Sequence, residues 1–209
     1  VTNEDDDYSD FSLFSRPAIV ASAVSLDDQH KAKKPKPQPG DISENTKQGF
    51  AALGLDPWLV NTVSGGLSMT APTAVQTACI PAILQNRDVI GVAQTGSGKT
   101  AAFALPILNT LNKDPFGPFA IVLTPTRELA VQIDEQFRVF GRDVLVKTML
   151  CIGGMDIVEQ ANGLLRRPHV VIATPGRLAD LISSSQDIAV LFKRCRFVVI
   201  DEADRLLEE

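Results

Sequence analysis

The chain has 209 residues, of which 44% are hydrophobic and 22% charged, and its formal net charge is −5. This composition indicates a globular protein with one sizeable core, and it excludes a uniformly basic chain, so any nucleic-acid binding must be local. No apolar run reaches the roughly 18 residues of a membrane-spanning helix, and the acidic N-terminus does not resemble a signal peptide. Three widely separated cysteines (Cys79, Cys151 and Cys195) argue against a disulfide framework or a zinc site and favour a reducing compartment.

Residues 1–45 have the composition of a tail. An acidic stretch (Glu4–Asp10) leads through an apolar segment (Phe11–Val24) to a stretch in which lysine and proline alternate (Lys31–Gly40). Proline removes amide donors and the lysine charges repel one another, which predicts a disordered N-terminal tail over residues 1–45. The lysines are typical of a solvated linker, with a weak phosphate-binding or targeting role as the alternative, and the apolar segment could bind a partner.

From Phe50 onward, short Val- and Ile-rich runs alternate with segments of helical period. We predict strands at Asp88–Val92, Phe119–Thr124, Lys147–Ile152, His169–Ala173 and Phe197–Asp201. We predict helices at Pro57–Val63, Ala74–Leu84, Thr100–Leu111, Arg127–Phe140, Ile157–Leu165 and Leu178–Ser183. This alternation predicts one α/β domain over residues 46–209, with a parallel sheet and helices on both faces. Ligands of such sheets bind at the carboxyl ends of the strands.

A glycine-rich turn follows the first of these strands and opens a helix. Its glycines permit a tight turn that aims backbone N–H groups at phosphate oxygens, and the helix dipole adds to the attraction. The lysine would reach the β- and γ-phosphates, and the threonine hydroxyl would bind Mg²⁺. Ala93 stands where the strict phosphate-loop pattern has glycine. The predicted phosphate-binding residues are Gln94, Thr95, Gly96, Ser97, Gly98, Lys99 and Thr100.

Two carboxylates follow the last predicted strand, which we expect to neighbour the strand before the phosphate loop. Asp201 is placed to bind Mg²⁺, and Glu202 to orient or deprotonate an attacking water. Alone, an Asp-Glu pair after a strand is more often the start of a helix. Together with the phosphate loop it predicts hydrolysis of ATP or GTP.

These motifs, with Pro125–Ala130, Gly153-Gly154 and Thr174–Arg177 between them, resemble those of the DEAD-box RNA helicases in order and spacing. The tetrad Asp201-Glu202-Ala203-Asp204 is the family's namesake. The resemblance covers residues 50–209 and implies a RecA-like (P-loop NTPase) fold, ATP with Mg²⁺, and RNA as partner. The Ser-Ala-Thr motif and the second RecA-like domain with its arginine finger are missing. We therefore expect a portion of a longer chain, truncated before the end of the domain and nearly inactive by itself.

The resemblance also implies an adenine-reading motif upstream. Gln76 matches the family's glutamine, and Phe50 its upstream aromatic residue. Ser68-Met69 replaces the usual Gly-Phe, so the Met69 thioether stands where a ring would lie. The stretch from Phe50 to this motif is one residue longer than in the family, around Gly65-Gly66. These departures leave open which side chain stacks on the base.

Three loops match the RNA-binding set of the family. They contain Pro125, Thr126, Arg127, Gly153, Gly154, Thr174, Pro175, Gly176 and Arg177. Such groups grip phosphates, so RNA binding should be independent of sequence and sensitive to salt. Helix capping is the alternative for the two threonines. Ion pairs with nearby acids, Glu128 or Asp180, are the alternative for the arginines.

The resemblance implies an ATP-dependent RNA helicase that couples ATP hydrolysis to RNA binding and local duplex unwinding. Similarities such as Leu53-Gly54-Leu55 and Cys79-Ile80-Pro81 resemble a nucleolar subgroup that acts in small-subunit ribosome assembly. They imply pre-rRNA as substrate, ribosome-assembly protein partners and a nucleolar location in the nucleus. The alternative is an ATP-dependent RNA clamp with little unwinding activity. A P-loop kinase or GTPase would leave the Pro125 and Thr174 loops unexplained.

Overall fold

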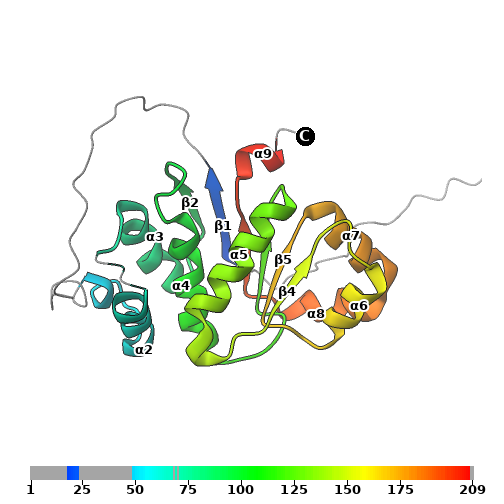
Figure 1. The fold of residues 1–209 in the computed structure, drawn as a ribbon, viewed down its shortest axis with the longest axis horizontal. Helices are drawn as coiled ribbons and strands as arrows, with labels where there is room; N and C mark the ends of the chain where they lie inside the picture. Colours follow the sequence, from blue (N-terminus) through cyan, green and yellow to red (C-terminus); the bar gives the residue numbers. More distant parts are fainter. Residues whose placement is uncertain (1–17, 24–48, 68, 70, 208–209) are drawn as a thin grey trace, which may run out of the picture.

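The computed structural model describes residues 18–23, 49–67, 69 and 71–207. Six parallel strands form one sheet in the order β2-β1-β6-β3-β5-β4 (Figure 1). Their bounds are β1 (Ala18–Ala23), β2 (Val89–Val92), β3 (Ala120–Leu123), β4 (Thr148–Cys151), β5 (Val170–Ala173) and β6 (Phe197–Ile200). The helices are α2 (Pro57–Asn61), α3 (Ala74–Leu84), α4 (Lys99–Leu111), α5 (Arg127–Phe140), α6 (Ile157–Leu165), α7 (Pro175–Ser184), α8 (Gln186–Leu191) and α9 (Ala203–Leu207).

Helices cover both faces of the sheet, because the strands alternate which side chains they send to each face. Val170 and Ile172 of β5 pack into a core with α3, α4 and α5. Val171 and Ala173, one residue along, pack into a second core with α6, α7 and α8. This arrangement confirms the predicted α/β class.

All five predicted strands are present, and α3, α5 and α6 have the predicted bounds. Their starts are fixed by side-chain caps: Thr73 accepts from the N–H of Gln76, Thr126 from Leu129, and Asp156 from Val158 and Glu159. The prediction for α7 began too late, since Pro175 occupies its first turn, where a missing N–H costs nothing. The short helices α8 and α9 were not predicted.

The prediction that residues 1–45 form a tail is wrong for residues 18–23. These residues form β1, which lies between β2 and β6 and pairs with both in parallel. As a central strand, this short apolar run pairs its backbone N–H and C=O groups on both sides. This pairing has a larger effect on its structure than the polar composition of the flanking residues. Residues 1–17 and 24–45 lie outside the described residues.

The sequence predicted that the strands carrying the two nucleotide motifs are neighbours, but β1 lies between them. β2, which leads into the phosphate loop, is not hydrogen-bonded to β6, which carries Asp201. Two inter-strand spacings, roughly 10 Å in all, separate them. Both strands still end at the same edge of the sheet.

The extra residue expected near Gly65-Gly66 is absorbed by a π-helical turn, η1 (Thr62–Gly66), that continues α2. A π turn closes a hydrogen bond to the fifth residue rather than the fourth, so it holds one residue more than an α turn. The N–H of Leu67 donates to the carbonyl of Thr62 at 3.1 Å. α3 then begins at Ala74.

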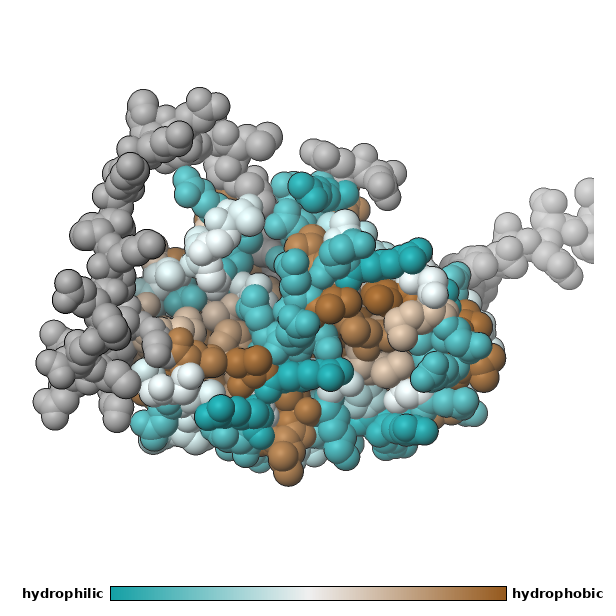
Figure 2. Space-filling view, viewed as in Figure 1, coloured by the Kyte–Doolittle hydropathy of each residue, from teal (hydrophilic) through white to brown (hydrophobic). Residues whose placement is uncertain are grey.

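The surface is mainly hydrophilic on the face that Figure 2 shows, with hydrophobic side chains gathered in separate patches. Exposed apolar residues include Leu145, Met155 and Val158. Within the described part of the chain, no helix has the length and apolar character needed to cross a membrane.

Candidate functional site

The phosphate loop leaves the carboxyl end of β2 and turns into α4. Gly96 (φ +79°) and Gly98 (φ +87°) both have left-handed backbone conformations, which L side chains rarely adopt. Gly98 is the N-cap of α4, so the thirteen-residue helix points its amino end at the loop. Unpaired N–H groups and the helix dipole meet there, which makes the loop suitable for anion binding.

Lys99 closes this loop in the structure. Its side chain is almost completely buried, and its Nζ donates to the carbonyl oxygen of Ala93 at 2.8 Å. The lysine therefore spans the loop from its last residue to its first. A phosphate group would have to replace this carbonyl as the partner of the ammonium.

Gln76 joins the start of α3 to the same loop. Its Oε1 accepts from the backbone N–H of Thr73 at 3.0 Å, and its Nε2 donates to the carbonyl of Gly98 at 3.2 Å. The side chain is 1% exposed. A Cβ atom at Gly98 would collide with Nε2, so the glycine is also needed for this close approach. The amide has one further N–H and one further lone pair, and adenine recognition by it stays a prediction.

The other two residues assigned to adenine recognition lie in or against the core. Phe50 has no exposed surface and packs with the buried residues of α3 and α4. The ring is buried here, and a contact between Phe50 and a base stays a prediction. Met69 is half-buried against the same core, and its N–H donates to the carbonyl of Val63 at 3.0 Å.

Asp201 and Glu202 follow β6 at the carboxyl edge. Asp201 is 6% exposed, and its N–H extends the strand pairing by donating to Leu123 at 2.8 Å. Glu202 has φ +53°, an uncommon conformation for a residue with a side chain and one that is concentrated at functional sites. Its Oε2 lies 3.9 Å from Nε of Arg205. The half-buried Thr100 begins α4 beside Lys99.

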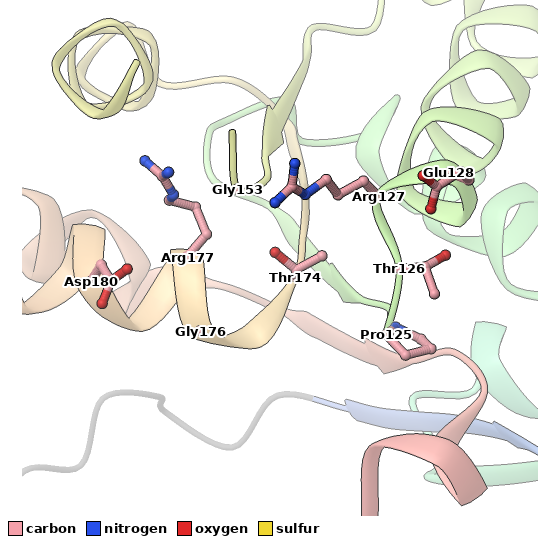
Figure 3. Close-up of a pocket in the computed structure, with 9 residues that line it drawn as sticks. All are labelled: Pro125, Thr126, Arg127, Glu128, Gly153, Thr174, Gly176, Arg177 and Asp180. Carbon is pink, nitrogen blue, oxygen red and sulfur yellow. The ribbon is translucent and has the colours of Figure 1, made fainter. Parts of the chain in front are cut away.

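The three loops that the sequence predicts to bind RNA meet around one cavity of about 630 Å³. We call this cavity the arginine groove. Figure 3 shows Arg127 extending from the start of α5 toward Gly153 and Thr174, with Arg177 entering from α7 on the opposite side. The residues that line it are Pro125, Thr126, Arg127, Glu128, Gly153, Thr174, Gly176, Arg177 and Asp180. Gly154 and Pro175, also predicted, are not among them.

The arginines of the groove are not paired with acids. Among the described residues no ion pair involves Arg127 or Arg177, although Glu128 and Asp180 line the same cavity. The guanidinium of Arg127 packs against Gly153 and Gly154, where a Cβ atom would crowd it. The alternative that these arginines form ion pairs with Glu128 or Asp180 is therefore wrong.

The two threonines differ. The Thr126 hydroxyl accepts from the N–H of Leu129 at 3.3 Å and so caps α5, as the alternative interpretation had it. Thr174 makes no side-chain cap, and Figure 3 shows its hydroxyl between the two arginines. Pro175 has no N–H, and open space surrounds the Gly176 Cα. The amino end of α7 is therefore available to an anion.

Cys151 ends β4, two residues before Gly153 of the groove, and has no exposed surface. Burial raises the pKa of its thiol to about 12, although the positive charge of Arg177 acts to lower it. The thiol is therefore neutral and packs as an apolar group. Glu128 and Asp180, which the sequence named as acids near the arginines, line the groove, although neither forms an ion pair with them among the described residues.

Comparison with protein-family models matches residues 73–209 to the DEAD/DEAH box helicases. The chain belongs to this family. The DEAD tetrad is the segment Asp201–Asp204 at the end of β6, and the family's phosphate loop is the one that Lys99 closes.

Two DEAD-box relatives and one solved structure illustrate the similarity. The human protein named probable ATP-dependent RNA helicase DDX49 is 60% identical over 161 residues, 77% of this chain and 33% of that protein. ATP-dependent RNA helicase dbp8 of Aspergillus terreus is 46% identical in an alignment that covers 99% of this chain and 41% of that protein. The RNA helicase Prp28 from Chaetomium thermophilum, bound to ADP, matches with a TM-score of 0.68 and 39% identity over 81% of this chain and 42% of that one.

Proposed function

We propose that this DEAD-box domain is the part of an ATP-dependent RNA helicase that binds ATP and one side of an RNA strand. One observation carries the proposal: the phosphate loop, the Asp201-Glu202 pair and the arginine groove all lie at the carboxyl edge of one parallel sheet. Nucleotide and RNA would thus contact loops of the same rigid sheet, which gives a direct route for coupling between them.

In the proposed nucleotide site, the N–H groups of residues 94–100 and the Lys99 ammonium hold the phosphates. Thr100 and Asp201 would hold Mg²⁺, which neutralises phosphate charge when bound. A hydroxyl and a carboxylate fit this ion, because Mg²⁺ takes oxygen ligands and usually keeps several waters and phosphate oxygens. Glu202 would orient the attacking water or accept its proton. Gln76 would read the adenine edge with its remaining amide groups.

In the proposed RNA site, phosphates enter the groove between Arg127 and Arg177. The Thr174 hydroxyl and the N–H groups of Gly176 and Arg177 lie at the amino end of α7, where an anion is favoured. These contacts reach the backbone of the strand rather than its bases, so we expect no sequence preference. Following the sequence resemblance, we further propose pre-rRNA as the substrate, ribosome-assembly proteins as partners and the nucleolus as the location.

The test uses the full-length protein and measures ATP turnover and duplex separation in parallel. Glu202→Gln should abolish RNA-stimulated turnover while sparing ATP binding, and Glu135→Gln, at an exposed position on α5, should leave both unchanged. Duplex separation that follows turnover supports a helicase, and turnover with tight RNA binding but no separation supports an RNA clamp. Full RNA-stimulated turnover in Glu202→Gln would contradict the proposed role of this residue.

The 209-residue chain alone should hydrolyse ATP only slowly, with or without RNA. A catalytic arginine supplied by another domain is worth roughly 10³–10⁵ in rate. Phosphate release from this chain, compared with that of the full-length protein at equal concentration, measures the difference. Robust RNA-stimulated release by the 209 residues would overturn the two-domain mechanism.

A further inference from the structure

The amino edge of the sheet, where the arrows of Figure 1 begin, carries a row of cationic residues. Hydrogen bonds link the residues that immediately precede four neighbouring strands. The N–H of Arg196 donates to Phe119 at 2.9 Å, the N–H of Phe119 to His169 at 2.8 Å, and the N–H of His169 to Lys147 at 2.7 Å. The row from β6 to β4 spans three inter-strand spacings, roughly 14 Å.

Five cations of this row make no ion pair among the described residues. Segments 165–169 and 192–196 contain Arg166, Arg167, Lys193, Arg194 and Arg196 and no Asp or Glu. In the described part of the chain, no ion pair involves Lys147 or any of these four arginines, all of which are exposed. By contrast, Lys113, Arg138 and Arg142 each pair with an aspartate. We call Lys147, Arg166, Arg167, Arg194 and Arg196 the amino-edge surface.

Aromatic rings hold two of its guanidinium groups in place. Arg194 lies 4.8 Å from the centre of the Phe116 ring, and Arg196 lies 5.8 Å from that of Phe119. The two rings contact each other edge to face, and their centroids are 5.1 Å apart. A guanidinium stacked on a ring keeps the N–H groups at its rim available, and this fork matches the oxygens of a phosphate.

A glycine brings the remaining arginines close to this pair. A Cβ atom at Gly117 would collide with the carbonyl oxygens of Arg167 and Pro168, so the loop that carries Phe116 packs directly on the loop that carries Arg166 and Arg167. Arg194 and Arg167 therefore flank one compact platform. Its backbone is tied into the sheet by the hydrogen bonds between the strands.

We propose that the amino-edge surface is a second RNA-binding site, at the end of the sheet opposite the arginine groove. A row of cations about 14 Å long, free of ion pairs within the described residues, is long enough to meet several phosphates of one strand, and stacked guanidinium planes are also suited to unpaired bases. The inference rests on the proposed function in one respect: it takes RNA as the ligand. The site anchors a flanking segment of the RNA whose other part occupies the groove.

The test compares two RNAs on the full-length protein: a short single strand that fills only the groove, and the same strand with a long single-stranded extension. The variant Arg167→Gln/Arg194→Gln should bind the extended RNA more weakly and bind the short one normally. The slope of log affinity against log salt should fall by about 1.4 for the extended RNA, since each lost single-strand phosphate contact removes about 0.7. The matched control, Lys113→Gln/Arg142→Gln, removes two exposed cations that already have acidic partners, and it should change neither slope.

ATP turnover stimulated by the short RNA separates this proposal from the proposed function. That stimulation should be the same in the variant and in the unmodified protein; its absence from the unmodified protein would refute the groove assignment instead. Equal weakening toward both RNAs, or no weakening toward either, would overturn the second site. If the variant binds polyglutamate more weakly but RNA as before, the second RNA site is overturned in favour of a site for an acidic protein partner.

Discussion

The phosphate loop and the arginine groove lie at the same edge of the sheet, yet they differ in how their polar groups are satisfied. In the loop, Lys99 is bound to the carbonyl of Ala93, and Gln76 to that of Gly98. In the groove, the side chains of Arg127 and Arg177 make no ion pair among the described residues and extend into the cavity (Figure 3). The loop must exchange internal hydrogen bonds for phosphate contacts, whereas the groove is already open to its ligand.

This difference has an energetic consequence. Replacing an internal hydrogen bond by one to a phosphate contributes only the difference between the two, so ATP affinity in this domain should be modest. A cationic groove needs no such exchange, and its affinity should depend mainly on salt. Breaking either site should therefore leave the other intact.

The largest effect is expected from Gly98→Ala. The left-handed backbone costs an alanine about 1–2 kcal/mol, and the added methyl group collides with Nε2 of Gln76. Nucleotide binding should be lost while RNA binding remains, as measured by titration with a fluorescent ATP analogue and with labelled RNA. Gly65→Ala is the control, because nothing lies within 4 Å of the added atom. Unchanged nucleotide affinity in Gly98→Ala would show that the loop does not need this conformation.

The next effect concerns the groove. Arg127→Gln should weaken RNA binding by roughly 1.5–3 kcal/mol, the usual value of a hydrogen bond to a charged group. It should also lower the salt slope by about 0.7 and leave ATP-analogue binding unchanged. Arg87→Gln, an exposed arginine at the opposite end of the sheet from the groove, serves as control. A comparable loss in that control would mean that only general charge matters.

Gln76→Ala tests whether the two parts of the nucleotide site act together. Loss of a bidentate base contact should reduce discrimination between ATP and GTP by roughly 1–3 kcal/mol. The bond to Gly98 is lost as well, so phosphate affinity should also fall, by a smaller amount. Gln76→Glu keeps the acceptor for Thr73 but cannot donate to Gly98, and it separates the two roles. Competition titrations with ATP and GTP measure both, and an unchanged ratio in Gln76→Ala would reject adenine recognition by this residue.

The smallest effect is expected at a group that belongs to neither site. Burial, with a contribution from the Lys147 charge, lowers the pKa of His169 below 6.5, and its Nδ1 accepts from the N–H of Lys147 at 3.1 Å. Below pH 6.5 the unfolded chain takes up the proton more readily than the folded one, so stability should fall as the pH decreases through this range. His169→Gln should remove this dependence, as measured by denaturant unfolding at a series of pH values. His30→Gln, which removes the other histidine of the chain, is the comparison; equal pH dependence in all three proteins would exclude His169 as its source.

Much of the fold could be predicted from local signals. Runs such as Phe197–Ile200 end in polar residues, and caps at Thr73, Thr126 and Asp156 fix the helix starts. The groove could be predicted as well, because polar residues after neighbouring parallel strands must converge. These features depend on residues that are close in sequence.

The rest depends on contacts between distant residues. β1 lies in the apolar segment Phe11–Val24, but the proline- and lysine-rich residues that follow it dominate the local composition and favour a tail. Phe50 is buried by α3 and α4, and no pattern around it distinguishes a core ring from one that faces a ligand. The bond between Gln76 and Gly98 joins positions whose proximity only the folded chain establishes.

The position of β6 also governs the order in which this domain can fold. Phe197, near the end of the chain, pairs with both Ala18 and Ala120. While the chain emerges from the ribosome, β3, β4 and β5 can associate early, but β1 and β3 each keep an unpaired edge until β6 has been synthesised. Such distant pairings are slow to form, and open edges are prone to aggregate meanwhile. The strand that joins β1 to β3 is the one that carries Asp201, so a nascent chain acquires the proposed catalytic carboxylates only in the step that unites these strands.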